Sequence, residues 1–460
     1  MRALRVLRNR GLHRTCVNAL AVVGLLALLQ CFLAVIPLTR EWCCQLVPKR
    51  YVPKVPLRDR VLQRGYGAAP ALPAAHKLRV LFLTHRYEYT SFMDRSFYYQ
   101  YEAARRHPDV EAVLWGWGLP EYDNARTLRE NLVRRYGSVY FDVIFLFGHV
   151  NATEVKAIGD AGEAVVAFRE FECFDFHCLR TLLPYGVHVF QLSYMVDMPL
   201  YLNYSFRRVV MHSPHCAEPS VFFAPPSLPG RHGALLIGAI SEAYPLRQRW
   251  KQLIDGGRLP AASQYRHPGY FQMTLEEAVD GGRPWQPSDD AHVAARNRQV
   301  ADYASAMHQA KVLLFDSSTY KYPLMKFIEG VMAGCLIISD LPNDRPELFA
   351  QLVVPVDPGA TDEELVDIVC YWLTHDQERI ARVRHAQSLI MAEFTWDRSI
   401  DRLIDGVHAY RQQAYGMYFS GSFILSCTSV NMIKGKARNA WCPDSARVDF
   451  PLAPDAVAVV

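Results

Sequence analysis

Short apolar runs alternate with amphipathic stretches along most of this chain of 460 residues. The run 77–84 has the length of a buried strand, and 91–107 carries apolar positions at helical spacing. Such alternation is typical of a parallel sheet covered by helices on both faces. It predicts further strands at 111–116, 141–148, 164–168, 187–192 and 208–211, and further helices at 124–136, 152–160 and 174–183.

A proline-rich stretch at 218–230 interrupts this pattern and is typical of an interdomain linker. Beyond it the alternation begins again, which predicts a second domain of the same class. The predicted elements are strands at 234–240, 310–315, 335–339 and 352–356 and helices at 245–255, 323–333, 362–374 and 377–393. The fold class is therefore α/β, with two Rossmann-like, doubly wound domains. The polar, Gly/Pro-rich stretch 256–287 is expected to be a long loop bordering a site.

The first forty residues have the pattern of a membrane anchor. Arg2, Arg5, Arg8, Arg10 and Arg14 precede a stretch without charges, and its apolar part, 16–38, would span about 35 Å as a helix. A cleaved signal peptide would have a shorter apolar region and a small-x-small cleavage site. The arginines before the span place the N-terminus in the cytoplasm and the rest of the chain in the lumen. We therefore expect a single-pass type II membrane protein of the Golgi or endoplasmic reticulum.

This topology sets the predicted domain boundaries. They are a cytoplasmic tail at 1–15, a signal anchor at 16–38, a stem at 39–76, a first Rossmann-like domain at 77–217, a linker at 218–232, a second Rossmann-like domain at 233–414 and a tail at 415–460. Asn151 and Asn203 lie in Asn-x-Ser/Thr tripeptides, which are glycan acceptors only in the lumen. We expect a glycan at Asn151.

Composition and missing motifs exclude several functions. With 50 Lys plus Arg, 46 Asp plus Glu, a net charge of +4 and 50% hydrophobic residues, the chain is neither disordered nor marked as a nucleic-acid binder. It carries no dinucleotide fingerprint, P-loop or hydrolase elbow, and no apolar strand ends in an Asp-x-Asp metal pair. His212, His215 and Cys216 are ligand-type residues, but no second pair follows at zinc-like spacing. We expect no metal and no cofactor.

The segment 310–340 carries the most chemistry. Its pattern predicts a buried strand, a polar loop, a helix and a second buried strand, with Gly334 ending the helix. Lys326 and Glu329 are three residues apart and therefore share a helix face, at the carboxyl end of the strands. Ligands of open α/β sheets bind at that end, where the N-terminus of the helix favours an anion.

At these residues the chain resembles a known family. Lys326-Phe-Ile-Glu-Gly-Val-Met-Ala-Gly-Cys-Leu-Ile-Ile-Ser-Asp340 is similar to the Lys/Arg-x-x-Glu motif of group 1 glycosyltransferases, which have the two-domain GT-B fold. The passage 214–225 resembles the family's interdomain segment, with Glu218 in place of Asp. Gly238 together with 244–249 is most similar to the spore-maturation glycosyltransferase-like branch. The resemblance covers about 214–394.

The resemblance implies a nucleotide-sugar donor in the second domain, an acceptor (glycan, protein or lipid) facing the first, and sugar transfer with retention and without metal. It implies that Glu329 binds the donor ribose, and that Lys326 and either Arg247 or Arg249 neutralise the diphosphate. Asp316, Ser317 and Ser318 would line the same pocket. The family's second acid is absent, because Lys321 stands eight positions before Glu329. From its place after the first strand, His85 is a candidate acceptor-side base or sugar contact.

Other interpretations remain open from sequence. Glu329 could be a helix acid paired with Lys326 or Arg345, and Arg247 and Arg249 could be solvated helix residues. His85 could be a structural strand-end histidine. An alternative to an active transferase is a catalytically inactive membrane protein of the same fold that binds a nucleotide sugar or glycan. The presence of Lys321 at the position of the family's second acid motivates this alternative. A two-Rossmann epimerase or phosphorylase would need no lumenal anchor.

Overall fold

The computed structural model describes residues 77–84, 95–146, 152–170, 185–195, 197–198, 201, 207–266 and 291–420, together with short strands between 423 and 448. These residues all belong to one compact unit. The predicted cytoplasmic tail, membrane anchor and stem lie outside them, as does the predicted helix 174–183. No helix in the described part of the chain is long and apolar enough to cross a membrane.

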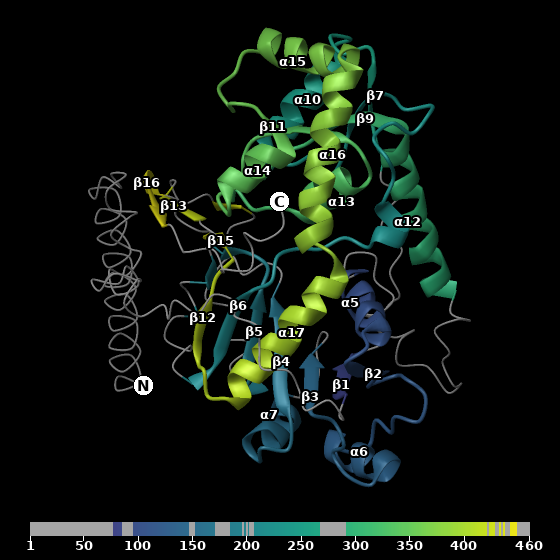
Figure 1. Cartoon of the computed structure of the whole chain (residues 1–460), viewed down its shortest axis with the longest axis vertical. Coiled ribbons are helices and arrows are strands. Elements are labelled where there is room, and N and C mark those ends of the chain that lie inside the picture. The colour runs from purple at the N-terminus through teal and green to yellow at the C-terminus, as the bar shows by residue number, and fades with distance from the viewer. Residues whose placement is uncertain are drawn as a thin grey trace, which may run out of the picture. The chain divides into compact units, whose positions relative to one another are not determined.

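The first domain is built on a seven-stranded parallel sheet, as the alternating pattern predicted (Figure 1). Its strands lie in the order β12-β6-β5-β4-β3-β1-β2. Their bounds are β1 (Leu78–Leu83), β2 (Val110–Trp115), β3 (Val143–Leu146), β4 (Val165–Glu170), β5 (Val189–Leu192), β6 (Val209–His212) and β12 (Gly416–Tyr418). Strands β3, β5 and β6 are buried at every position, and all their residues except Gln191 and His212 are apolar.

The helices of this domain are α5 (Arg95–Arg106), α6 (Leu128–Tyr136) and α7 (Ala152–Asp160). Helix α6 ends at the predicted residue but begins four residues after the predicted start at 124. Thr127 and Glu130 form a reciprocal capping box at its start, and Gly137 ends it with φ of 78°, in the left-handed region that glycine adopts without strain.

The second domain has a five-stranded parallel sheet in the order β11-β10-β9-β7-β8. Its strands are β7 (His232–Leu236), β8 (Ala262–Gln264), β9 (Ala310–Leu314), β10 (Leu336–Ser339) and β11 (Val353–Pro355). Its helices are α10 (Pro245–Asp255), α12 (Ala291–Gln309), α13 (Met325–Met332), α14 (Pro346–Leu352), α15 (Asp362–Thr374) and α16 (Asp376–Glu393). Strand β8 lies in the stretch that we predicted to be a long loop. Its Ser and Gln, exposed or half-buried at the sheet edge, give no apolar signal.

The predicted boundary at residue 414 is wrong, because the chain returns to the first domain earlier. Helix α17 (Trp396–Arg411) packs on α5, β5 and β6, and strand β12 extends the first sheet beside β6. A Cβ at Gly406 would lie 2.7 Å from the Met211 sulfur and 2.8 Å from a Val189 methyl carbon. Glycine therefore lets this helix approach the sheet closely. The strand pairs β13 (Phe423–Cys427) with β16 (Cys442–Val448) and β14 (Met432–Ile433) with β15 (Lys436–Ala437) lie in the predicted tail.

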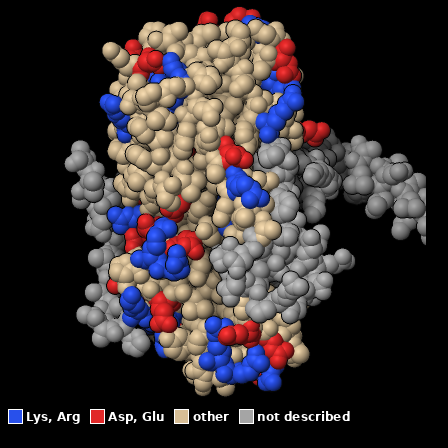
Figure 2. All heavy atoms as spheres, turned by 90° about the vertical axis from the view of Figure 1, so that its right-hand side faces the viewer, with Lys and Arg blue, Asp and Glu red and all other residues tan. Residues whose placement is uncertain are grey.

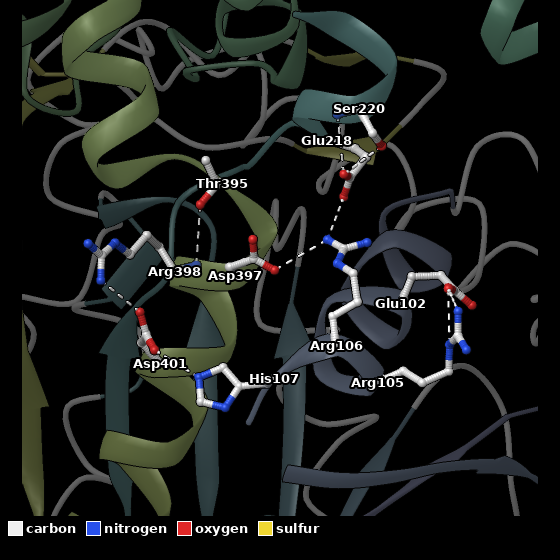
Figure 3. A network of polar contacts seen from close by, with 10 residues as sticks. All are labelled: Glu102, Arg105, Arg106, His107, Glu218, Ser220, Thr395, Asp397, Arg398 and Asp401. Carbon is white, nitrogen blue, oxygen red and sulfur yellow. Dashed lines mark hydrogen bonds and ion pairs between the residues drawn. The ribbon is translucent and has the colours of Figure 1, made fainter. Parts of the chain in front are cut away.

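The chain passes between the two domains at two points, near Ala217 and near Thr395. These two segments, the crossings, run side by side. The Ala217 N–H donates to the Phe394 carbonyl at 3.0 Å, and Ala217 pairs with Thr395 in a parallel bridge. Figure 3 shows Arg106 of α5 reaching both crossings: it donates to Glu218 at 3.1 Å and to Asp397 at 3.2 Å. Glu218 also caps α9 (Pro219–Phe222) through Ser220. Glu218 therefore helps to hold the two crossings together, through Arg106.

Charged side chains of both signs are mixed on the face shown in Figure 2, where blue and red groups lie close together. The second domain has ion pairs between its elements, such as Lys311 with Asp376 at 2.8 Å and Arg258 with Glu363 at 2.8 Å. This mixture agrees with the small net charge of +4.

Candidate functional site

The candidate site lies where strands of the second sheet end. Gly238 follows β7, Asp316 follows β9 and Asp340 follows β10, so the parallel sheet brings these residues to one edge. Helix α13 begins after the loop that leaves β9 and carries Lys326 and Glu329. Strand order and strand direction therefore assemble the residues that the sequence motif suggested.

Glu329 is buried, with a residue exposure of 1%. Its Oε1 accepts hydrogen bonds from Arg95 Nε at 3.2 Å and Arg95 Nη2 at 2.7 Å. The second oxygen, Oε2, is also buried and accepts no hydrogen bond from the described residues. Arg345, which the sequence offered as a partner, instead pairs with Glu393. Glu329 thus has one oxygen bound across the domains and one oxygen able to accept hydrogen bonds from a ligand.

Arg95 comes from α5 of the first domain and was not predicted as a site residue. Burial pulls its pKa down, but the charge of Glu329, with smaller contributions from Tyr303 and Tyr99, raises the pKa above its ordinary value. Tyr303 of α12 is buried near Arg95 and Glu329. Burial, and then the Glu329 charge, raise the pKa of Tyr303 well above its usual value, so its hydroxyl stays neutral. No local motif marks Arg95, because its significance depends on a contact 234 residues away.

Gly238 brings two cations together. Its φ is +95°, and a Cβ added there would lie 2.6 Å from Arg247 Nη1 and 3.1 Å from Lys326 Cε. Only the absence of a side chain lets both cationic residues come so close to this turn. The arrangement fits an anionic group bound beside the strand end, as the sequence predicted for Lys326 and Arg247.

Arg247 is fully buried in a network that fixes its orientation. Its Nε lies 2.9 Å from Asp316 Oδ1, and its Nη2 and Nη1 donate to the carbonyls of Asp316 at 3.0 Å and Ala239 at 3.2 Å. The guanidinium stacks on Tyr244, 3.5 Å from the ring centroid. Burial lowers the pKa of Arg247, although Asp316 opposes this effect. The alternative of a solvated helix residue is wrong for Arg247.

Arg249 lies two residues after Arg247 on α10, and its side chain points toward the start of α15. It bonds Asp362 at 2.6 Å and the carbonyls of Ala360 at 2.7 Å and Pro358 at 3.1 Å, at the start of α15. Of the two arginines suggested for the diphosphate, the structure therefore brings Arg247 to Gly238 and Lys326, and it places Arg249 in a surface contact between helices.

The loop after β9 contains three buried polar residues, Asp316, Ser317 and Ser318. Their hydrogen bonds mainly stabilise the conformation of this loop. Asp316 accepts from the backbone N–H groups of Leu246 at 3.0 Å and Arg247 at 3.2 Å and so caps α10. Burial raises its pKa, although the charge of Arg247 pulls it down. Ser317 donates its hydroxyl to Asp340 at 3.0 Å, and Ser318 accepts from the Tyr320 N–H at 3.2 Å.

Lys321, which stands where the family has an acid, forms an ion pair with the buried Asp340. Its φ of 55° places it in the left-handed region. Asp340 in turn accepts from the Ser317 N–H at 2.7 Å. The Lys321 ammonium is therefore part of the loop's own network at the carboxyl end of β10.

The first domain contributes an aromatic and histidine cluster that sequence reasoning missed. His215, after β6, contacts the Tyr194 hydroxyl through Nε2 at 3.0 Å, and the Tyr194 ring stacks on Tyr322 of the second domain at 3.9 Å. The Tyr322 hydroxyl donates to Asp197 at 3.0 Å. Burial, followed by the positive charges of Arg169, Arg95 and Lys326, lowers the pKa of His215 well below its ordinary value. A neutral imidazole thus lies within the electrostatic reach of the site's cations.

Three predicted residues, His85, Asn151 and Asn203, lie outside the described residues. His212, which the sequence suggested as a metal-type ligand beside His215, contacts Ser420. In the part of the chain that the structure describes, no three His, Cys, Asp or Glu side chains gather as metal ligands.

A family model described as glycosyl transferase-like matches residues 268–405. No curated protein matches the sequence. The solved structures that it resembles include HepE from Anabaena in complex with UDP, at 12% identity and a TM-score of 0.42, covering 71% of this chain and 99% of that one. A UDP-forming trehalose-phosphate synthase from Burkholderia vietnamiensis is similar at 12% identity and a TM-score of 0.45, covering 74% and 99%.

The N-terminal domain of a trehalose-6-phosphate phosphatase from Candida albicans is also similar, at 10% identity and a TM-score of 0.46, covering 76% and 99%. With TM-scores below 0.5, these likenesses carry no part of the argument. The family match includes both Lys326 and Glu329, and it confirms the resemblance to glycosyltransferases and the predicted enzyme class. Within the chain, the segment 268–405 is thus similar to a glycosyl transferase-like family.

Proposed function

We propose that this protein transfers a sugar from a nucleotide-sugar donor to a glycan, protein or lipid acceptor in the secretory pathway, with retention and without a bound metal. One observation carries the proposal: the buried Glu329 Oε2, which accepts no hydrogen bond from the described residues, lies on the same short helix as Lys326, at the end of the second sheet and within the matched segment. This combination suits a ligand that carries both hydroxyl donors and negative charge.

The site residues divide the work of holding a donor. Glu329 Oε2 accepts hydrogen bonds from the ribose hydroxyls. Lys326 and the fixed Arg247 place positive charge beside the diphosphate at Gly238. As the glycosidic bond breaks, the leaving nucleotide gains negative charge, and cations already held in position stabilise it without having to reorganise. Lys326 is half-buried, and the buried Arg247 is the fixed source of positive potential.

The ion pair between Lys321 and Asp340 favours a second candidate, a protein that binds a nucleotide sugar or glycan without transferring it. Lys321 stands at the position of the family's second acid and is held in the loop network, so a donor-sugar contact through a carboxylate is replaced there by a cation. This candidate shares the nucleotide site and differs only in the chemical step.

A donor panel separates the two candidates. The full chain in detergent or nanodiscs is incubated with UDP-, GDP- and CMP-sugars, and release of free nucleotide and sugar is followed by chromatography. We expect slow hydrolysis of one donor, which Glu329→Gln abolishes. If a nucleotide sugar binds but is not hydrolysed or transferred to any acceptor, the binding protein is the correct candidate.

The predicted anchor at 16–38 supports a type II location in the Golgi or endoplasmic reticulum. Because the apolar span carries no charge, the protein should stay in membranes after washing with alkaline carbonate, and its body should be protected from protease in sealed vesicles. Endoglycosidase should shift its mobility through the glycan expected at Asn151. Release by carbonate would contradict the anchor.

A further inference from the structure

We propose that Arg95 is a positioning residue for the donor: it holds Glu329 so that Oε2 faces the ribose hydroxyls, and it thereby makes nucleotide affinity depend on the first domain. The inference rests on the proposed function, since it assigns a partner to the carboxylate that binds the nucleotide.

The geometry of the pair is the first argument. Two nitrogen atoms of one guanidinium, Nε at 3.2 Å and Nη2 at 2.7 Å, both donate to the same carboxylate oxygen, Oε1. A usual side-by-side pair would use both oxygens, with one nitrogen on each. Here the whole fork lies on Oε1, which leaves Oε2 as a buried acceptor with no hydrogen bond from the described residues.

Burial is the second argument. The side chains of Arg95 and Glu329 are exposed by only 11% and 1%, so water compensates little of either charge. A buried carboxylate keeps its charge only where a cation or several donors stabilise it. Since Tyr303 and Tyr99, which lie near the pair, are held neutral by burial, the guanidinium supplies the compensating charge that lets Glu329 accept strongly from a ligand.

The third argument is position in the chain. Arg95 begins α5 in the first domain, and Glu329 lies on α13 in the second. The pair is therefore a non-covalent contact between the domains, in addition to the two crossings of the chain. At the other end of the same helix, Arg106 binds both crossings (Figure 3). Helix α5 thus contacts both crossings at one end and Glu329 at the other, and a change in its position would move Oε1.

The test is a comparison of two ligands that differ only in the ribose hydroxyls. UDP, GDP and ADP, and their 2′,3′-dideoxy forms, are titrated calorimetrically into the full chain, and the base that binds is used thereafter. The wild type should prefer the ribose form by roughly tenfold or more, because its hydroxyls donate to a charged acceptor. Arg95→Met should reduce this preference to less than about threefold and leave affinity for the dideoxy form nearly unchanged.

Arg105→Met is the matched control, since Arg105 lies on the same helix and pairs with Glu102 three residues earlier, away from Glu329. It should keep the wild-type preference. Arg95→Lys, which keeps the charge but loses the two-nitrogen fork, should restore part of the preference and serves if Arg95→Met does not fold. In a Glu329→Gln background, Arg95→Met should cause no further loss of preference.

The outcomes separate this inference from the proposed function. If the wild type binds no nucleoside diphosphate, or does not distinguish the ribose form from the dideoxy form, both are overturned. If Glu329→Gln loses the preference while Arg95→Met keeps it, only the role of Arg95 is overturned. A gain of affinity in Arg95→Met would show that Arg95 competes with the ribose for Glu329, and this too would overturn the inference.

Discussion

Replacing Asp316 with Asn should lower the free energy of unfolding by about 3–5 kcal/mol. Asp316 and Arg247 have side chains exposed by only 1% each and their charged atoms lie 2.9 Å apart. Removing one charge leaves the other buried and uncompensated, which costs far more than the pair contributes relative to an apolar replacement. The substitution also weakens the acceptor that caps α10 through the Leu246 and Arg247 N–H groups.

The neighbouring pair provides a control for this prediction. Arg249 and Asp362 lie 2.6 Å apart, but their side chains are 28% and 45% exposed. Because water and salt screen such a pair, Asp362→Asn should cost no more than about 1 kcal/mol. Urea unfolding followed by circular dichroism measures both variants. Equal losses would show that burial of the Arg247–Asp316 pair does not set its contribution.

The second large effect is expected at Gly238. Gly238→Ala should reduce nucleotide affinity by at least about tenfold, because the new Cβ would lie 2.6 Å from Arg247 Nη1 and 3.1 Å from Lys326 Cε. Arg247 is fixed by Asp316 and two carbonyls, so it has little room to move aside. The substitution should also destabilise the fold by about 1–2 kcal/mol, since alanine is strained at a φ of +95°.

Gly257→Ala separates these two causes. Gly257 has a φ of +71°, and a Cβ there would meet nothing within 4 Å. It should therefore show a similar loss of stability with unchanged nucleotide affinity. Thermal unfolding and calorimetric titration of both variants provide the comparison. Equal affinity in the two would mean that no ligand lies beside Gly238.

Fold class was predictable because the alternation of apolar runs and amphipathic helices survives in both sheets. The end of α6 before Gly137 was predicted correctly, but its start was placed at 124, although Thr127 and Glu130 form the capping box that begins the helix at Leu128. The position of α17 was not, because an amphipathic pattern identifies an apolar face and does not say which sheet it covers. Its close contact with β5 and β6 depends on Gly406, whose role becomes visible only beside Met211 and Val189.

The site was predictable where its residues belong to one local motif. Lys326 and Glu329 are three residues apart on one helix, and the structure places them at the predicted strand ends. Arg95 and Tyr194 were missed because they come from distant segments and carry no motif, and His215 was considered only as a metal-type ligand. The choice between Arg247 and Arg249 could not be made from sequence either, since both lie on the same helix and only the fold shows that one is buried against Asp316 and the other faces Asp362.

The most direct test of the central claim is nucleotide titration of Glu329→Gln beside the wild type and a control, Glu102→Gln, which alters a carboxylate of α5 that pairs with Arg105. The change at Glu329 is nearly isosteric; it removes the charge and replaces one acceptor oxygen with an amide donor. We expect nucleoside diphosphate affinity to fall by about 1–3 kcal/mol in Glu329→Gln, while it remains unchanged in Glu102→Gln. A folded Glu329→Gln protein that binds nucleotide as tightly as the wild type would remove Glu329 from the donor site and contradict the assignment.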